Sequence, residues 1–282
     1  MNSRTDLAIE LEKQCCADIS GIRKNEKENG EVKVTEIEIL SDQAEKSIGK
    51  PKGKYITIEF PSIEKINCYD EIRDELISAL KTFLGSSFEK ILVIGLGNDE
   101  ITADSIGPKT AKQLLATRHI AGDFAEKIGL KGLHSTSVLV PNVLGKTGIE
   151  VSEITEGIIK KTNPQAVIVI DALASASINR LFKTIQLSNT GISPGSGVKN
   201  SRKELSEKNL GLPVIAIGVP TVVDALTLAF EITENIPKND TDMIVTPKDA
   251  DLLSDRMSEI LSEGLNIFLQ PEIEPEIIFS LV

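Results

Sequence analysis

Two apolar runs decide the fold of this chain: Lys90-Ile-Leu-Val-Ile-Gly-Leu-Gly-Asn98, and Ala166-Val-Ile-Val-Ile170, which runs directly into Asp171. Continuous apolar strands are typical of a parallel α/β sheet that is covered on both faces. Ligands bind such sheets outside the carboxyl ends of the strands. Asp104, a few residues beyond the first run, and Asp171 are therefore expected at one edge of the same sheet. Two carboxylates there could perform acid–base chemistry on water without a metal or a cofactor.

Strand and helix patterns alternate on both sides of these runs. Further strands are predicted at 31–40, 54–60, 135–140, 184–187 and 213–219, and helices at 70–84, from Asp104 or Ser105 to about 118, at about 152–161, at 221–235 and from Thr246 onward. Residues 24–30 are expected to form a solvated loop, and the strands flanking 49–53 an outlying hairpin-like pair. The alternation predicts a three-layer α/β/α sandwich, of phosphorylase/hydrolase-like type, with a mostly parallel central sheet.

Composition limits the class of protein. The chain has 282 residues, a net charge of −11 and 40% apolar residues, as in soluble globular proteins. The negative charge argues against direct binding to nucleic acid or to an anionic membrane surface. With no apolar leader at the N-terminus and no run of transmembrane length, a cytoplasmic location is expected. Cys15, Cys16 and Cys68 form no CxxC motif, which favours a reducing compartment and argues against a structural zinc site.

Each candidate site residue also has an ordinary structural interpretation. Asp104 is as well suited to cap a helix as to act in catalysis. Asp171 favours function, because an acid directly after five apolar residues is costly to bury unless it is paired. Gly95-Leu-Gly97 lacks the third glycine and the later acid of a dinucleotide loop, and it could instead turn the backbone to present Asn98 and Asp104.

Other motifs carry weaker indications. The long polar loop at 186–202 could form a phosphate-binding nest, a flap over a site or an ordinary surface loop, and it lacks the ending of a P-loop. His119 and His134 are the only histidines, which leaves little material for a Ser-His or Cys-His triad. Thr5-Asp-Leu-Ala-Ile-Glu10 reads as the start of an amphipathic helix, or, beside a peptidase site, as a self-cleavage sequence.

Short motifs along nearly the whole chain resemble one known family, the germination proteases of spore-forming bacteria. The matching stretches are, in order, Arg4-Thr-Asp-Leu-Ala8, Gly95-Leu-Gly-Asn98, Asp104 with Gly107-Pro108, Thr117-Arg-His119, Val140-Pro141, Thr147-Gly-Ile-Glu150, Asp171-Ala-Leu-Ala174, Pro194-Gly-Ser-Gly197, Pro213-Val-Ile-Ala-Ile-Gly218, Pro220-Thr-Val-Val-Asp-Ala225 and Val245-Thr-Pro-Lys248.

The resemblance implies an endopeptidase of the spore core that begins the degradation of small acid-soluble spore proteins during germination. It implies a homotetramer made as a zymogen, without a metal or other cofactor, whose essential acids are Asp104 and Asp171. Self-processing would cut between Asp6 and Leu7, leaving residues 1–6 as a short propeptide and 7–282 as a single α/β peptidase domain.

The two aspartates are interpreted as a pair that holds the attacking water, one as base and the other as acid. If Asp104 lies at a helix N-terminus, it is the better base, which leaves Asp171 as the acid. A related fold occurs in hydrogenase-maturing endopeptidases, which hold a metal with two acids and a histidine. Neither His119 nor His134 is assigned to that third place, so a metal-dependent endopeptidase remains the alternative enzyme. A phosphate- or nucleotide-binding protein that uses the glycine loops is the alternative outside enzymes.

Overall fold

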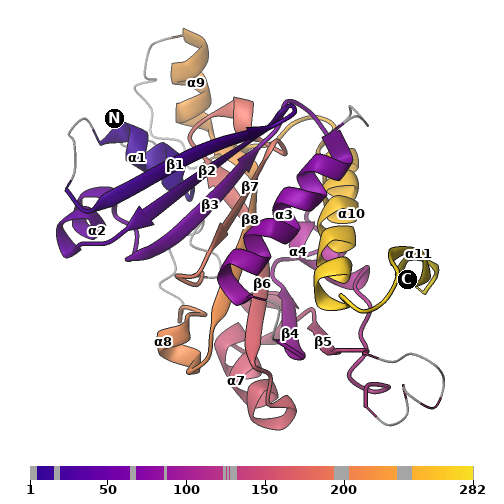
Figure 1. The fold of residues 1–282 in the computed structure, drawn as a ribbon. Coiled ribbons are helices and arrows are strands. Elements are labelled where there is room, and N and C mark those ends of the chain that lie inside the picture. Colours follow the sequence, from indigo (N-terminus) through magenta and orange to yellow (C-terminus); the bar gives the residue numbers. More distant parts are fainter. Residues whose placement is uncertain are drawn as a thin grey trace.

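The structure, a computed structural model, describes residues 5–15, 20–63, 68–85, 88–122, 125, 127, 132–193, 203–233 and 243–281. The elements follow one another along the chain as drawn in Figure 1. They are α1 (Ala8–Gln14), β1 (Ile22–Asn29), β2 (Val32–Ile39), α2 (Asp42–Ile48), β3 (Gly53–Glu59), α3 (Tyr69–Leu84), β4 (Lys90–Gly95), the 3₁₀ turn η2 (Thr102–Asp104), α4 (Ile106–Lys112), β5 (Ser135–Leu139), α6 (Leu144–Thr147), α7 (Val151–Thr162), β6 (Ala166–Ser175), η3 (Ile178–Arg180), β7 (Thr184–Ser188), α8 (Glu207–Leu210), β8 (Val214–Asp224), α9 (Ala225–Thr233), β9 (Ile244–Val245), α10 (Ala250–Leu269) and α11 (Pro275–Ser280).

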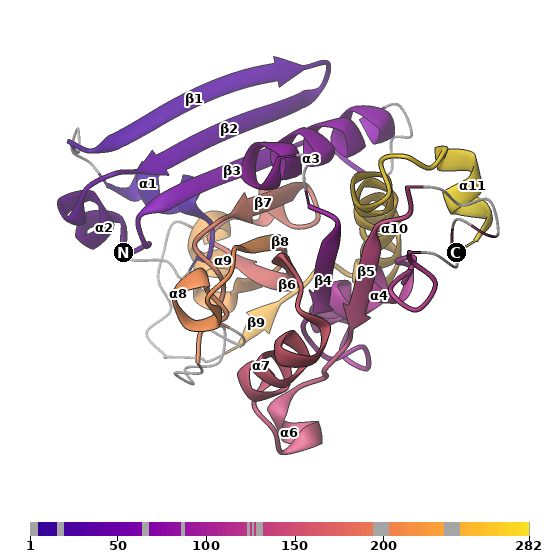
Figure 2. The ribbon, with the colours of Figure 1, turned by 60° about the horizontal axis from the view of Figure 1, so that its bottom comes forward.

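One mixed sheet runs through the described part of the molecule. Its strands lie in the order β1-β2-β3-β7-β8-β6-β4-β5, and β9 pairs with β8. β5, β4, β6 and β8 are parallel to one another, whereas β7, β3, β2 and β1 continue the sheet with antiparallel pairs. Figure 2 shows β1–β3 as a long ribbon that extends from the parallel part. The predicted α/β architecture with a central sheet between helices is confirmed, but the expectation of a mostly parallel sheet is wrong for the described strands, because most of their pairs are antiparallel.

Helices cover both faces of the sheet. α3 and α10 pack against each other over one face, as Figure 1 shows. α3 forms there because Ile72, Leu76 and Leu80 recur at helical spacing and are fully buried, and because Gly85 ends it at φ 68°. The other face is covered by α7 beneath the parallel strands and by α1 and α2 beneath β2 and β3.

Several element boundaries differ from the predictions. Residues 24–29 of the expected loop belong to strand β1, which forms because its backbone pairs with β2 although nearly all its side chains are exposed. β2 and β3 do pair, but α2 connects them in place of a hairpin turn. The helix expected from Thr246 begins only at Ala250, with Asp249 as its N-cap. The helix expected to run to about 118 ends at Lys112.

The two strands that carry the site are longer than predicted. β6 does not end at Ile170 but continues to Ser175, so Asp171 lies inside the strand. β8 continues through Pro220 to Asp224, which replaces the first turn of the helix expected at 221. The two strands stay in register up to Leu173, where a bulge shifts the pairing. The sheet thus extends past Asp171 and provides a surface there for another segment of the chain.

Candidate active site

Asp171 is placed by the alternation of β6. Ile168 and Ile170 pack toward α3 and α10, so Asp171 lies on the opposite face of the sheet. Its side chain is only 7% exposed, and Oδ1 accepts a hydrogen bond of 2.9 Å from the following amide, Ala172 N. Its register partner on β8 is Gly218, which has no side chain to cover the carboxylate.

Asp104 lies just beyond β4, the neighbour of β6 in the sheet. Its Oδ2 accepts a hydrogen bond of 2.9 Å from Asn98 N, which closes the loop after the strand. Gly97 allows this closure because its φ is +112° and a Cβ there would lie 2.1 Å from the Asp104 carbonyl oxygen. The N-cap of α4 is Ser105, so the Asp104 carboxylate closes this loop and does not cap the helix.

The turn that carries Asp104 is fixed to the strands beside it. Thr221 Oγ1 of β8 donates a hydrogen bond of 2.6 Å to the Ala103 carbonyl, and the turn also contacts β6. Asp104 and Asp171 therefore lie on segments that contact each other, although Asp171 lies inside β6 and not at the strand end where the sequence pattern had placed it.

Gly95 and Gly107 have a packing role in this region. A Cβ at Gly95 would lie 2.2 Å from the Gly107 carbonyl oxygen, and one at Gly107 would lie 2.5 Å from the Ile170 carbonyl oxygen. These contacts are possible only between bare backbones, and they bring the start of α4 directly onto the ends of β4 and β6. Gly95, one of the two glycines that suggested a nucleotide loop, thus allows a helix to pack closely on the sheet.

The N-terminal segment docks on the part of β6 beyond Asp171. Asp6 N donates a hydrogen bond of 2.9 Å to the Ala174 carbonyl, and Ala174 N donates one of 2.9 Å to Asp6 Oδ2. Leu7, Ala8 and Ile9 are 0%, 0% and 1% exposed, because they pack in the apolar cluster beneath β2 and β3. The Asp6–Leu7 bond, the expected self-cleavage bond, is therefore held against the strand that carries Asp171.

Gln186 of β7 holds both sides of that bond. Its Oε1 accepts a hydrogen bond of 2.7 Å from Ala8 N, and its Nε2 donates one of 3.2 Å to the Asp6 carbonyl oxygen. Gln186 is the register partner of Gly218 on one side, as Asp171 is on the other. Gln186 was not predicted as a site residue. Its position between Ile185 and Leu187 in a buried strand could have indicated one, because a polar side chain there needs a partner.

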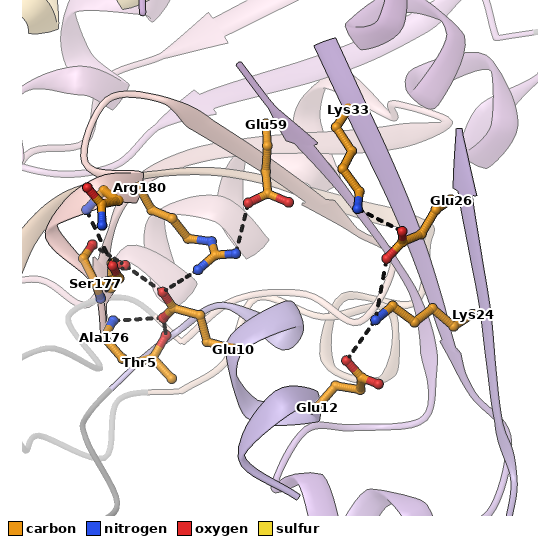
Figure 3. A network of polar contacts seen from close by, with 12 residues as sticks. Thr5, Glu10, Glu12, Lys24, Glu26, Lys33, Glu59, Ala176, Ser177 and Arg180 are labelled. Carbon is orange, nitrogen blue, oxygen red and sulfur yellow. Dashed lines mark hydrogen bonds and ion pairs between the residues drawn. The ribbon is translucent and has the colours of Figure 1, made fainter. Parts of the chain in front are cut away.

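A buried carboxylate fixes α1 in place (Figure 3). Glu10, only 5% exposed, accepts hydrogen bonds from Ser175 Oγ at 2.8 Å and from Ala176 N at 2.7 Å. It also accepts a hydrogen bond from the Thr5 hydroxyl and pairs with Arg180, 3.3 Å from its Nη1. Arg180 in turn pairs with Glu59 of β3 at 2.8 Å. Since Thr5 and Glu10 lie on opposite sides of the Asp6–Leu7 bond, this network spans it.

A cavity of about 270 Å³ opens beside the docked segment. Asp6, Gln186 and Gly218 line it together with Lys50 and Glu204. Burial lowers the pKa of the Lys50 ammonium, and the charges of Asp6 and Glu204 oppose that shift. Nothing in the sequence near Lys50 had indicated this position.

The remaining candidates are placed as follows. His119 is exposed, and His134 is fixed through its backbone by the Gln270 side chain. Within the described ranges, no three His, Cys, Asp or Glu side chains form a group that could hold a metal ion. None of the described helices has the length and apolar character needed to cross a membrane. The motif at 194–197, most of the loop at 186–202, Cys16 and residues 1–4 lie outside the described part of the chain.

Comparison with known proteins gives a consistent result. Residues 3–239 match the family model described as germination protease. A germination protease of Clostridium tetani is 41% identical, and the alignment covers 99% of both chains. One from Clostridium acetobutylicum is 38% identical over 97% of both chains. One from Priestia megaterium is 44% identical over 84% of this chain and 67% of its own.

Among solved structures, one that matches this chain is a nickel–iron hydrogenase maturation protease of Thermococcus kodakarensis. It matches with a TM-score of 0.39 and 15% sequence identity, over 66% of this chain and 98% of its own.

Proposed function

Because this chain belongs to the germination protease family, we propose that it is an aspartic endopeptidase whose carboxylate pair is Asp104 and Asp171. Its substrates in this proposal are small acid-soluble spore proteins, cut in the spore core when germination begins. The chain is made as a zymogen, assembles as a homotetramer and processes itself between Asp6 and Leu7. The single observation that supports the site best is the row Gln186, Gly218 and Asp171 across neighbouring strands.

The row supports the site because Gln186 and Asp171 project from the same face of the sheet. Register partners in a sheet point to the same face, so Gln186 and Asp171 flank Gly218 on one surface. Neighbouring strands lie about 4.8 Å apart, so the Cα atoms of Gln186 and Asp171, which are two strands apart, are separated by about 10 Å. Gln186 holds the Asp6 carbonyl and the Ala8 amide over this surface. The bond to be cut is thereby kept on the face from which Asp171 projects.

The reaction needs one base and one acid. In our proposal Asp104 takes a proton from the water as its oxygen attacks the Asp6 carbonyl carbon, and Asp171 gives a proton to the departing Leu7 nitrogen. The new carboxylic acid at the Asp6 carbonyl carbon then loses the water's second proton to the Leu7 amine, which leaves a carboxylate and an ammonium, and the proton held by Asp104 returns to Asp171 to restore the pair. We assign the role of acid to Asp171 because it is the more buried of the two.

Gln186 supports this step through its amide nitrogen. Negative charge develops on the Asp6 carbonyl oxygen when water adds, and Nε2 of Gln186 already donates to that atom. A fixed donor at such an oxygen stabilises the transition state more than the ground state. Its Oε1 meanwhile holds the Ala8 amide, so the peptide does not rotate as the carbonyl carbon becomes tetrahedral.

The test is a set of isosteric substitutions. Asp104→Asn and Asp171→Asn are each expected to remove self-processing, followed as loss of residues 1–6 by intact mass, and to remove cleavage of an acid-soluble spore protein. Asp224→Asn is the matched control, because Asp224 Oδ1 accepts a hydrogen bond of 2.8 Å from Leu226 N at the far end of β8. A fully active Asp104→Asn or Asp171→Asn chain would refute the proposed pair.

A further inference from the structure

The cavity beside the N-terminal segment receives one side of the Asp6–Leu7 bond. Asp6 lines it, whereas Leu7 is fully buried in the apolar cluster with Ile37 and Tyr55. The acid before the bond and the aliphatic residue after it therefore occupy separate environments, one polar and open to the cavity, the other dry.

Lys50 is the cation in the wall of this cavity. The residue is half-buried, and its ammonium donates no hydrogen bond to another residue of the described ranges. Its anionic neighbours are Asp6 and Glu204, and burial lowers its pKa despite both of them. Because the ammonium is partly desolvated, water screens its attraction to a carboxylate in the same cavity only weakly.

We propose that this cavity is the subsite for the acidic side chain that precedes the cleaved bond, and that Lys50 is its specificity residue. This inference rests on the proposed self-processing between Asp6 and Leu7, and Asp6 is its occupant in this structure. Two features select a carboxylate. Ala174 N donates to Asp6 Oδ2 at 2.9 Å, and Lys50 supplies the opposite charge.

The two features exclude different side chains. An amide side chain keeps an oxygen for Ala174 N but loses the attraction to Lys50. A basic side chain loses the hydrogen bond and is repelled by the ammonium. Glu204 has a separate effect: its charge favours the protonated form of Lys50 after Asp6 has left, so the subsite stays cationic for the next substrate.

The experiment is a double-mutant cycle in the full-length chain. Asp6→Asn removes the charge and keeps the acceptor for Ala174 N, and Lys50→Met removes the ammonium and keeps the aliphatic stem. Self-processing, measured as the rate at which residues 1–6 are lost, is expected to slow about 10-fold in each single variant, because each variant removes one of two opposite charges that attract each other across a partly desolvated cavity. The double variant is expected to be no slower than either, because both changes remove the same interaction.

A second readout separates specificity from folding. For the processed enzyme, kcat/KM is measured on a peptide copied from residues 3–10 and on the same peptide with Asn in place of Asp6. The preference for the acid is expected to fall close to one in Lys50→Met. Lys52→Met is the control, since Lys52 is exposed and pairs with Asp42 at 2.6 Å. Thermal unfolding of each variant checks that it is folded.

The outcomes distinguish this inference from the function on which it rests. Additive effects in the cycle, normal processing of Lys50→Met, or an unchanged acid preference would overturn the Lys50 assignment alone, provided that Asp171→Asn is inactive. A wild-type chain that never loses residues 1–6 and does not cut the peptide would overturn both.

Discussion

Asp171 and Gln186 lie in one row of the sheet, each the register partner of Gly218 from an opposite side. Between them is a glycine, and the side chain of Leu173 occupies the space where the glycine's Cβ would be. Above this row Gln186 holds the backbone on both sides of the Asp6–Leu7 bond. The relationship joins two residues with separate tasks: one supplies a carboxyl group, and the other positions the peptide.

Gln186→Leu is expected to slow self-processing about 100-fold. Leucine has a similar size but cannot donate to the Asp6 carbonyl oxygen, and the loss of one such donor has an effect of that order in other hydrolases. The processing rate by intact mass is the measurement. Gln165→Leu is the control, because Gln165 Oε1 accepts hydrogen bonds from Glu89 N and Lys90 N at the opposite end of β6. Equal slowing in both variants would show that Gln186 acts only through stability.

Gly218→Ala is expected to lower stability by about 1–3 kcal/mol, as overpacking of a core does, and to impair processing. The added Cβ would lie 2.2 Å from Leu173 Cδ1 and 2.5 Å from Leu173 Cγ, and Leu173 is itself buried. Urea unfolding measures the change. Gly157→Ala provides the contrast: this glycine lies inside α7 with nothing within 4 Å of its would-be Cβ. That variant is expected to gain up to about 1 kcal/mol from helix propensity.

The pKa of Lys50 predicts a pH dependence of stability. Burial lowers it in the folded chain from its ordinary value of 10.5. Between the lowered and the ordinary value the unfolded chain binds more protons, so the free energy of unfolding rises with pH in that window. Lys50→Met is therefore expected to be at least as stable as the wild type at neutral pH, with a difference that shrinks toward pH 10.5.

Urea unfolding of both chains over that pH range is the measurement. Tyr55, whose pKa burial raises to about 12, titrates in both chains and cancels in the difference. A Lys50→Met chain that is clearly less stable than the wild type at neutral pH would contradict the lowered pKa.

Glu10→Ala is expected to destabilise the unprocessed chain by about 3 kcal/mol, because it removes an acceptor of the buried Ser175 hydroxyl, the acceptor of the Ala176 amide, and one of the two carboxylates that pair with Arg180. Hydrogen exchange in α1 should rise as the segment loosens. Glu12→Gln on the same helix is the control: Glu12 pairs with Lys24 at 3.1 Å near the surface, and such pairs contribute at most about 1 kcal/mol. Similar losses in the two variants would mean that the Glu10 network does not fix the helix.

The sequence predicted those parts of the fold whose pattern is local. The apolar spacing of α3 and the glycine that ends it are sufficient to define that helix. β1 was missed because Ile22–Asn29 has no buried face and is a strand only through its pairing with β2. The extension of β6 was missed because the acid at 171 resembles a strand end, whereas Leu173 and Ala174 return to the core and continue the strand.

For the site, strand order predicted that Asp104 and Asp171 come from neighbouring parts of the sheet, but it placed Asp171 at the end of a strand that continues to Ser175. Gln186 and Lys50 could not be found in that way. Gln186 meets Asp6 across 180 residues of sequence, and Lys50 lies in a connection between α2 and β3 that has no periodicity. Contacts of this kind depend on how distant segments pack, which no local pattern encodes.

The hydrogen bond from Thr5 to Glu10 crosses the bond that we propose is cut. Leu7 N donates to the same Thr5 hydroxyl at 3.0 Å, so the hydroxyl lies between the Leu7 nitrogen and the carboxylate. Cleavage would remove Thr5 and turn that nitrogen into an ammonium beside a buried anion. The measurement is the affinity of a synthetic peptide of residues 1–6 for the processed chain and for the processed chain that carries Glu10→Gln. Tighter binding to the variant would show how strongly the new ammonium and Glu10 oppose rebinding. The departing segment could return only by separating this new ion pair, so cleavage would be effectively irreversible.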